Sequence, residues 1–350
     1  MNSLRSIAVV FAMALALAGG GVLLTSVTGT AANGGVAPVA DSAAVSFHAP
    51  YVSGQCAMCH DPATPSGNSP GKIPGDIGAL CATCHYDMDE EIKSSQVVHA
   101  PAMMGCTTCH NPHNSVNSSL LIDPPKNLCL GCHGEIQQTI AGARVQHDAV
   151  VDENACMNCH TPHASNIQHL LTALPFDLCV SCHSQDNKVD SDGRLLTNFG
   201  KLLAENPYHH GPVQGKDCSA CHLTHGGENH SLLVADYPAR FYSPYEPDNY
   251  ALCYRCHNDA NMADPETTTT TRFRDGSRNL HYLHVNKADR GRTCRACHEV
   301  HASENPHQVR DAVPFGPRNW MLPINYTKTD TGGSCARTCH QTKSYDFTKK

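Results

Sequence analysis

The organisation of the chain is set by a stretch that reads Cys106-Thr-Thr-Cys-His110-Asn-Pro-His113 and resumes as Leu128-Cys129-Leu-Gly-Cys-His133. Each part has two cysteines three positions apart, with a histidine directly after the second. Residues three and four apart lie on the same face of a helical turn, so both thiols and the imidazole point to one side. Two such thiols can each bond one vinyl group of the same porphyrin, and the histidine can offer a nitrogen to its iron. Cys-x-x-Cys-His is the attachment signature of c-type haem.

This motif recurs along the whole chain and uses every cysteine in it. Nine copies have this spacing. The tenth, Cys335-Ala-Arg-Thr-Cys339-His340, has one more residue between its cysteines, and a local bulge could keep the second thiol within reach. We therefore predict ten covalently bound haems c. The expected attachment cysteines are Cys56, Cys59, Cys81, Cys84, Cys106, Cys109, Cys129, Cys132, Cys156, Cys159, Cys179, Cys182, Cys218, Cys221, Cys253, Cys256, Cys294, Cys297, Cys335 and Cys339. The expected proximal iron ligands are His60, His85, His110, His133, His160, His183, His222, His257, His298 and His340.

Two other uses of paired cysteines compete with this interpretation. Four thiolates can hold a zinc ion, and exported chains rich in cysteine often carry disulfides. Neither use requires a histidine after the second cysteine. That histidine is nevertheless present in all ten motifs, although only 24 of the 350 residues are histidine. The pattern therefore favours haem over zinc and over disulfides.

Further histidines recur in register with the motifs, which form five pairs. One histidine precedes each pair, and another follows the first motif of every pair but the first, as Cys-His-x-x-His. The second histidine of that element is too close in sequence to reach the far side of its own iron, so we expect it to serve a neighbouring haem. Axial histidine is a common iron ligand. The expected distal ligands are His48, His99, His113, His147, His163, His210, His225, His284 and His301, and the tenth would be His281 or else His209.

The composition suggests that side chains alone do not form the core. Only 16% of residues are charged and 6% aromatic, while the chain has 26 glycines and 22 prolines. A chain so poor in large apolar side chains has difficulty burying enough surface to offset its conformational entropy. We expect a multihaem cytochrome c fold, mostly coil with short α-helices and little or no β-sheet. It would be an elongated, haem-cored repeat chain in which each repeat contacts its neighbours.

The motif spacing and the N-terminal residues suggest a division of the chain. Arg5, the apolar run at 7–17 and the small residues before position 33 are typical of a signal peptide. An uncleaved anchor is the alternative, because residues 6–27 are uncharged for long enough to span a bilayer. The expected parts are a signal peptide (1–32), a flexible segment (33–47), three compact dihaem repeats (48–185), a linker (186–206), two expanded dihaem repeats (207–342) and a tail (343–350).

The units that begin at Cys106 and Cys156 resemble the doubled-CXXCH multihaem cytochrome family. Ten haems on a chain of this length are also similar to the decahaem periplasmic subunits of porin–cytochrome conduits. This likeness covers about residues 48–342. It implies electron transfer in the periplasm, at the outer membrane or outside the cell. The implied partners are redox proteins, including an outer-membrane porin-like barrel and an extracellular cytochrome.

The expected ligands favour an electron carrier over an enzyme. An iron with two histidine ligands keeps no open position for a substrate, and its potential is low because a methionine ligand is what raises it. Two alternatives stay open, namely a multihaem reductase with one open haem, sought first in the first pair, and a subunit of an extracellular cytochrome filament. We find no phosphate loop, no nucleophile–base constellation and no basic patch for nucleic acid, and we expect no small-molecule substrate.

Overall fold

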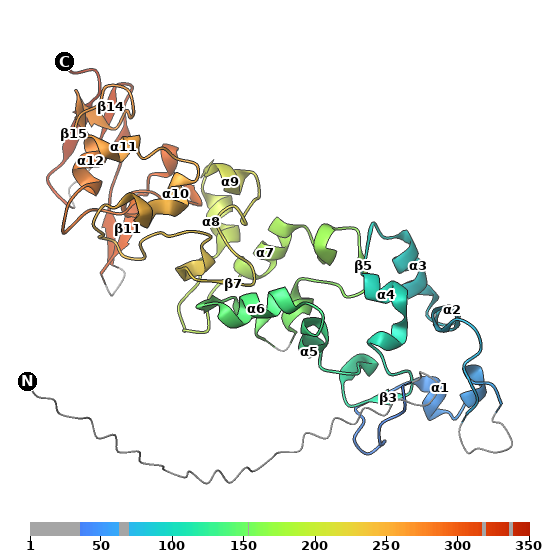
Figure 1. Cartoon of the computed structure of the whole chain (residues 1–350). Helices are drawn as coiled ribbons and strands as arrows, with labels where there is room; N and C mark the ends of the chain where they lie inside the picture. The colour runs from blue at the N-terminus through green and yellow to red at the C-terminus, as the bar shows by residue number, and fades with distance from the viewer. Residues whose placement is uncertain (1–35, 63–69, 153, 317–319, 336–338) are drawn as a thin grey trace, which may run out of the picture.

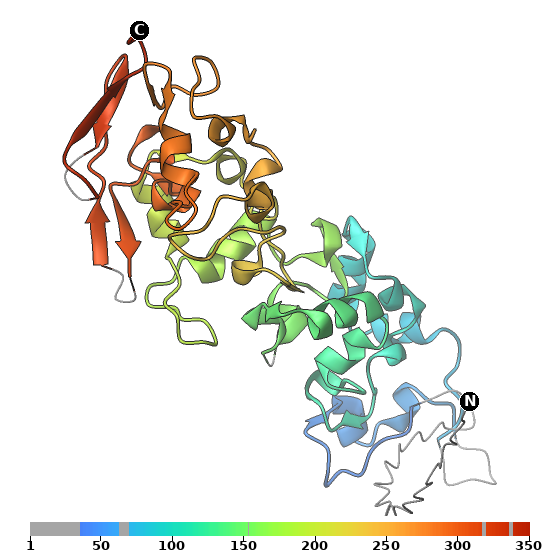
Figure 2. The same ribbon diagram turned by 60° about the vertical axis from the view of Figure 1, so that its left-hand side comes forward.

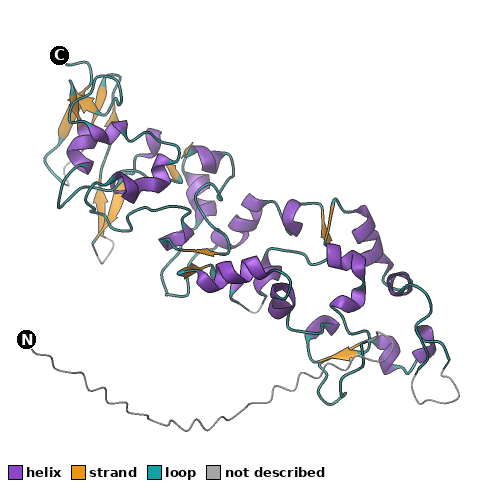
Figure 3. Cartoon of the chain, in the orientation of Figure 1, coloured by secondary structure: helices purple, strands orange, loops and turns teal. Residues whose placement is uncertain are grey.

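The computed structural model describes residues 36–62, 70–152, 154–316, 320–335 and 339–350. Both ribbon views show an elongated molecule in which successive parts of the chain follow one another from one end to the other (Figures 1 and 2). The expected signal peptide at 1–32 lies outside the described residues. The prediction of an elongated, coil-rich chain with short helices is confirmed, as Figure 3 shows.

The helices are short, and prolines help to start several of them. Proline stands in the first turn of α1, α4, α5, α7 and α9, where its fixed φ suits the helix and its missing N–H costs nothing. None of the helices in the described part of the chain is long and apolar enough to cross a membrane. They are α1 (Ala49–Val52), α2 (Ile77–Ala82), α3 (Tyr86–Ser94), α4 (Ala100–Met104), α5 (Pro125–Leu130), α6 (Gly134–Gly142), α7 (Pro175–His183), α8 (Phe199–Glu205), α9 (Gly211–Gln214), α10 (Ala251–Tyr254), α11 (Ala260–Ala263) and α12 (Leu280–Val285).

Four two-stranded antiparallel sheets join consecutive pairs of motifs. In each sheet, the strand just before the upstream histidine of one pair meets the strand just after the Cys-His-x-x-His element of the next pair. We call each of these sheets a clasp. The four clasps are β1 (Ser46–Phe47) with β3 (Asn114–Ser115), β2 (Val97–Val98) with β5 (Ala164–Ser165), β4 (Val145–Gln146) with β7 (Gly226–Gly227), and β6 (Tyr208–His209) with β10 (Ala302–Ser303).

The remaining strands lie in the C-terminal part of the chain. The hairpin β8 (Arg274–Asp275) to β9 (Arg278–Asn279) precedes α12, and β11 (Ala312–Phe315) pairs with β12 (Trp320–Pro323). A three-stranded sheet has the order β13 (Thr327–Lys328), β14 (Gly332–Cys335), β15 (Lys343–Asp346). The segment expected to be a tail, 343–350, therefore begins with a paired strand. Gly332 is required in this sheet, because a Cβ there would lie on the carbonyl oxygen of Tyr345.

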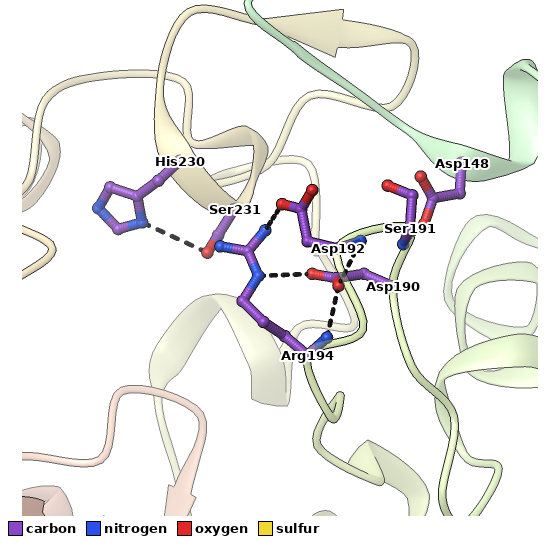
Figure 4. Close-up of polar contacts among 7 residues, drawn as sticks. All are labelled: Asp148, Asp190, Ser191, Asp192, Arg194, His230 and Ser231. Carbon is purple, nitrogen blue, oxygen red and sulfur yellow. Dashed lines mark hydrogen bonds and ion pairs between the residues drawn. The ribbon is translucent and has the colours of Figure 1, made fainter. Parts of the chain in front are cut away.

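The expected linker at 186–206 forms a turn followed by α8. Figure 4 shows the Arg194 guanidinium bridging Asp190 and Asp192, with N–O distances of 2.8 Å to each. The amide of Ser191 donates a hydrogen bond to the Asp148 carboxylate at 2.9 Å. This turn therefore attaches the segment to the third pair of motifs.

The side-chain core is small and lies beside the cysteine motifs. Its buried cluster consists of Leu233, Tyr237 and Tyr250, and Cys253 and Cys294 pack against it. A connected cavity of about 4230 Å³ runs through the described structure from Val97 to Phe347, lined by motif cysteines and by histidines. This volume is several times that of an ordinary ligand pocket, which is about 300–1,000 Å³.

Candidate metal centres

We number the ten motifs 1 to 10 in chain order, from Cys56 to Cys335. Motifs 1 to 9 form the helical turn that their spacing predicts. In motif 1 the amides of Cys59 and His60 donate to the carbonyl of Cys56 at 3.2 and 2.9 Å. This turn brings the two thiols and the imidazole to one side. Motif 10 differs, because Cys335 is the last residue of β14. The bulge expected in motif 10 falls on residues 336–338, which lie outside the described residues.

Nine of the ten motif histidines face a second histidine across a gap. The ring centroids are 5.9–6.4 Å apart, with interplanar angles of 9–28° in eight pairs and 42° in the ninth. The pairs, with the motif histidine first, are His60–His113, His85–His48, His110–His163, His133–His99, His160–His225, His183–His147, His222–His301, His257–His210 and His340–His284.

The width of these gaps fits one metal ion between two nitrogens. An ion bonded to both imidazoles at about 2.0 Å would hold the ring centroids roughly 6.2 Å apart, counting about 1.1 Å from nitrogen to centroid in each ring. Rings in direct contact would be much closer, because touching carbon atoms lie about 3.5–4.0 Å apart. In motifs 1 to 9 the helical turn brings the motif thiols to the same side as the motif imidazole. These residues therefore fit a planar haem that is held through its edge by thioethers and through its iron by two imidazoles.

The pairing follows one rule. A motif histidine with an even number faces the histidine that precedes its own pair, as His85 faces His48. A motif histidine with an odd number faces the Cys-His-x-x-His histidine of the following pair, as His60 faces His113. The clasps explain this geometry, because each one holds side by side the two histidines that face the two motif histidines of one pair. In the first clasp the amide of His48 donates to the carbonyl of His113 at 2.9 Å.

The rule also explains why the first pair has no Cys-His-x-x-His element. That histidine would serve an earlier pair, and none of the ten motifs precedes motif 1. Both motif histidines of the first pair have facing partners, so the geometry does not single out this pair as the place of an open iron. The motif histidine outside the nine facing pairs is His298 of motif 9.

His281 lies near enough to the remaining motif histidine, His298, for their charges to interact. Burial lowers the pKa of His281 to about 4, and the nearby positive charge of protonated His298 contributes. Nδ1 of His281 lies 3.1 Å from the hydroxyl of Thr271, which leaves Nε2 for another partner. The second candidate, His209, instead donates from Nε2 to the carbonyl of Leu203 at 3.0 Å.

In the five odd-numbered motifs, carbonyl groups fix which nitrogen of the motif histidine carries the proton. Nδ1 of His110 donates to the carbonyl of Ser119 at 2.9 Å, and Ser119 has a positive φ of 53°. Because a carbonyl only accepts, Nε2 is the unprotonated nitrogen that can bind a metal. The same contact joins His160 to His169, His222 to Ser231, and His298 to His307. Each of these four contact residues lies nine positions after its motif histidine, and Ser119 and Ser231 both stand in an Asn-x-x-Leu-Leu stretch.

The thiols of consecutive motifs lie next to one another. Burial and a hydrogen bond with the Cys106 thiol raise the pKa of Cys81 to about 11. A hydrogen bond from Cys218 lowers the pKa of Cys179 to about 7. Further neighbouring thiols are Cys59–Cys81, Cys109–Cys132, Cys129–Cys156, Cys159–Cys182, Cys221–Cys253, Cys253–Cys294 and Cys297–Cys335. The motifs therefore follow each other in space in the same order as in the sequence.

Within the described residues, no three or more His, Cys, Asp or Glu side chains come together as a metal-ion site. All twenty cysteines are free thiols in the structure.

Comparison with known proteins agrees with the sequence pattern. The family model described as "Doubled CXXCH motif" matches residues 48–90, 99–138, 147–188 and 210–262. The protein "Multiheme cytochrome MtrA" of Shewanella baltica (strain OS185) is 32% identical over 101 residues. That similarity covers 28% of this chain and 28% of the relative, so it spans less than a third of either protein.

Proposed function

This chain belongs to the doubled CXXCH motif family of multihaem c-type cytochromes, and from that premise we propose that it holds ten haems c in one row and relays electrons along it. The observation that carries the proposal is the set of nine imidazole pairs whose centroids are 5.9–6.4 Å apart. Each bound haem would supply an iron that changes between the ferric and ferrous states by one electron. The role of the chain is to anchor, cap and align these groups.

We assign the axial ligands according to the facing pairs. The motif histidines are the proximal ligands, and the nine histidines that face them are the distal ligands. For the tenth iron we choose His281 over His209, because His281 lies near His298 with Nε2 free while Nε2 of His209 already donates to a carbonyl. With two imidazoles on each iron, substrate has no vacant coordination position, which supports electron transfer over catalysis.

The contacts between neighbouring thiols support electron flow in the order of the motifs. Each thiol would be bonded to the edge of a porphyrin, so thiols in contact bring the edges of consecutive porphyrins together. The contact between Cys81 and Cys106 does this between pairs, and the proximity of Cys109 to Cys132 does it within a pair. A row of haems whose neighbouring edges all lie close together needs no mobile electron carrier between its two ends.

We propose that the protein is exported and works in the periplasm or at the outer membrane, with redox proteins at the two ends of the row. The N-terminal residues typical of a signal peptide support export. The similarity to a multiheme cytochrome MtrA supports an outer-membrane porin-like barrel and an extracellular cytochrome as partners. That support comes from about a quarter of the chain.

Haem counting and spin state test this proposal. The pyridine adduct of the purified protein should give ten haems c per chain, and electron paramagnetic resonance of the oxidised protein should show all ten low-spin. A colourless protein, or thiols that hold zinc, would overturn the proposal. One high-spin iron that binds carbon monoxide after reduction would favour the reductase alternative, and we would look for it at motif 9, where the following pair is missing. Polymers in electron micrographs of secreted material would favour the filament.

A further inference from the structure

The residue that follows the motif histidine in Cys-His-x-x-His differs among the four copies. It is Asn111, Thr161, Leu223 and Glu299 in chain order. Glu299 is the one that can present a carboxylate to the distal histidine two residues on. Its side chain is only 15% exposed, so this carboxylate acts in a poorly hydrated environment where electrostatic interactions are strong.

Glu299 is fixed from two sides. One carboxylate oxygen, Oε1, accepts a hydrogen bond from Nδ1 of His301 at 3.0 Å. The other, Oε2, pairs with the Arg310 guanidinium at 2.7 Å, and that arginine side chain is 12% exposed. Nε of Arg310 also donates to the carbonyl of His298 at 3.0 Å. The carboxylate therefore has one orientation, and it lies behind the imidazole that faces His222.

Resting on the proposed function, we propose that Glu299 lowers the reduction potential of the iron held between His222 and His301, relative to the sites whose distal histidine lacks a carboxylate. A carboxylate that accepts the second N–H of a metal-bound imidazole increases the basicity of the ligand. A more basic ligand stabilises the ferric over the ferrous ion, and hydrogen bonding around the axial ligands is one of the means by which a protein sets haem potential. Glu299 touches no cofactor, so it is a positioning residue that acts through His301.

The neighbouring site, at motif 6, has no acceptor for the second nitrogen of its motif histidine in the part of the chain that the structure describes. Among the described residues, Nδ1 of His183 in motif 6 is buried without a hydrogen-bond partner. The ring of Phe199 on α8 lies between these two sites, at 4.7 Å from the ring of His301 and 6.2 Å from that of His183. The proposed difference in potential therefore falls between motifs 6 and 7, where the three compact pairs meet the two expanded pairs. One electron that crosses there oxidises one ferrous iron and reduces one ferric iron, and no bond is broken.

The test is a spectroelectrochemical titration of the full-length, haem-loaded protein. Glu299→Gln keeps an acceptor for His301 but removes the charge, and Glu299→Thr copies the natural residue of motif 5. In both variants one-tenth of the total absorbance change, which is the share of one haem, should occur at a higher potential than in the wild type. The expected shift is about 59 mV for one electron, which corresponds to a tenfold change in the reduction equilibrium. The matched control is Glu205→Gln, which removes a charge from an exposed pair with Lys201 at 3.9 Å. Its titration curve should superimpose on that of the wild type.

A reciprocal variant keeps the inference testable if the Glu299 variants do not load haem. Asn111→Asp keeps the oxygen that lies 3.3 Å from Nδ1 of His113, and it adds a charge. One-tenth of its absorbance change should move to lower potential. Superimposed curves for every loaded variant, with ten low-spin haems in the wild type, would overturn this inference alone. A wild type without ten haems would overturn the proposed function as well.

Discussion

Replacing His163 with alanine should make an iron high-spin in a pair to which His163 does not belong. His163 is part of the third pair, three residues after the motif histidine of motif 5. Its ring, however, faces His110 of motif 3 at 6.0 Å, while His160 faces His225. Burial and the neighbouring His110 lower the pKa of His163, which favours the neutral form of its imidazole.

The expected size of the effect follows from the count of sites. His163→Ala leaves all twenty attachment cysteines in place, so the pyridine adduct should still give ten haems. One iron in ten should become high-spin in the electron paramagnetic resonance spectrum, and one carbon monoxide should bind per reduced chain. The other nine irons should stay low-spin, because each keeps both imidazoles.

A second substitution identifies the iron concerned. Adding Cys106→Ala and Cys109→Ala removes the attachment of the haem at motif 3, so the high-spin signal of His163→Ala should disappear and nine low-spin haems should remain. The matched control adds Cys156→Ala and Cys159→Ala, which removes the haem at motif 5 and should leave the signal from motif 3. If the high-spin signal persists in the first combination and vanishes in the second, the pairing across units is wrong. A single His163→Ala protein with ten low-spin irons would remove His163 from the ligands.

The same structure makes three further predictions. His281→Ala should give one high-spin iron by paramagnetic resonance, whereas His209→Ala should give none; the reverse result would exchange their roles. A chain that ends at residue 206 keeps motifs 1 to 6 but loses His225, so it should hold six haems of which the one at His160 is high-spin, and six low-spin haems would contradict the rule of pairing. Gly226→Ala places a Cβ 2.7 Å from that of Ala143 in the β4–β7 clasp, which should cost about 1–3 kcal/mol of stability. Thermal unfolding measures this cost, and Gly134→Ala is the control because a Cβ there meets nothing within 4 Å.

The local part of the site could be predicted from the sequence because its chemistry is local. The Cys-x-x-Cys-His spacing fits one helical turn, and nine motifs adopt it with the amide of the histidine bonded to the carbonyl of the first cysteine. The recurrence of spare histidines also marked the residues that face the motif histidines. The first inference needed only the geometry of five successive residues, and the second needed only the repetition of one pattern along the chain.

The pairing of particular histidines could not be predicted, because it depends on contacts between distant parts of the chain. The strands that hold His48 beside His113 have two residues each, too few to show an alternating pattern. The sequence suggested the first pair as deficient, whereas both motif histidines of that pair face a second histidine. The role of Ser119 was hidden as well, because a positive φ at a serine has no clear signature. The position of Cys335 in a strand follows from the C-terminal sheet, which the composition did not indicate.

The clasps also set the order in which the row can be completed as the chain is made. The partner of His85 is already present when motif 2 emerges, because His48 precedes it, but His60 must wait for the unit that brings His113. A chain that is synthesised from its N-terminus would therefore always contain one odd-numbered motif whose distal histidine has not yet been added. Each added pair of motifs would provide the distal histidine for the odd-numbered motif of the pair before it. A chain of this kind could therefore lengthen in steps of two haems, and only its last odd-numbered motif would need a distal histidine from another part of the chain.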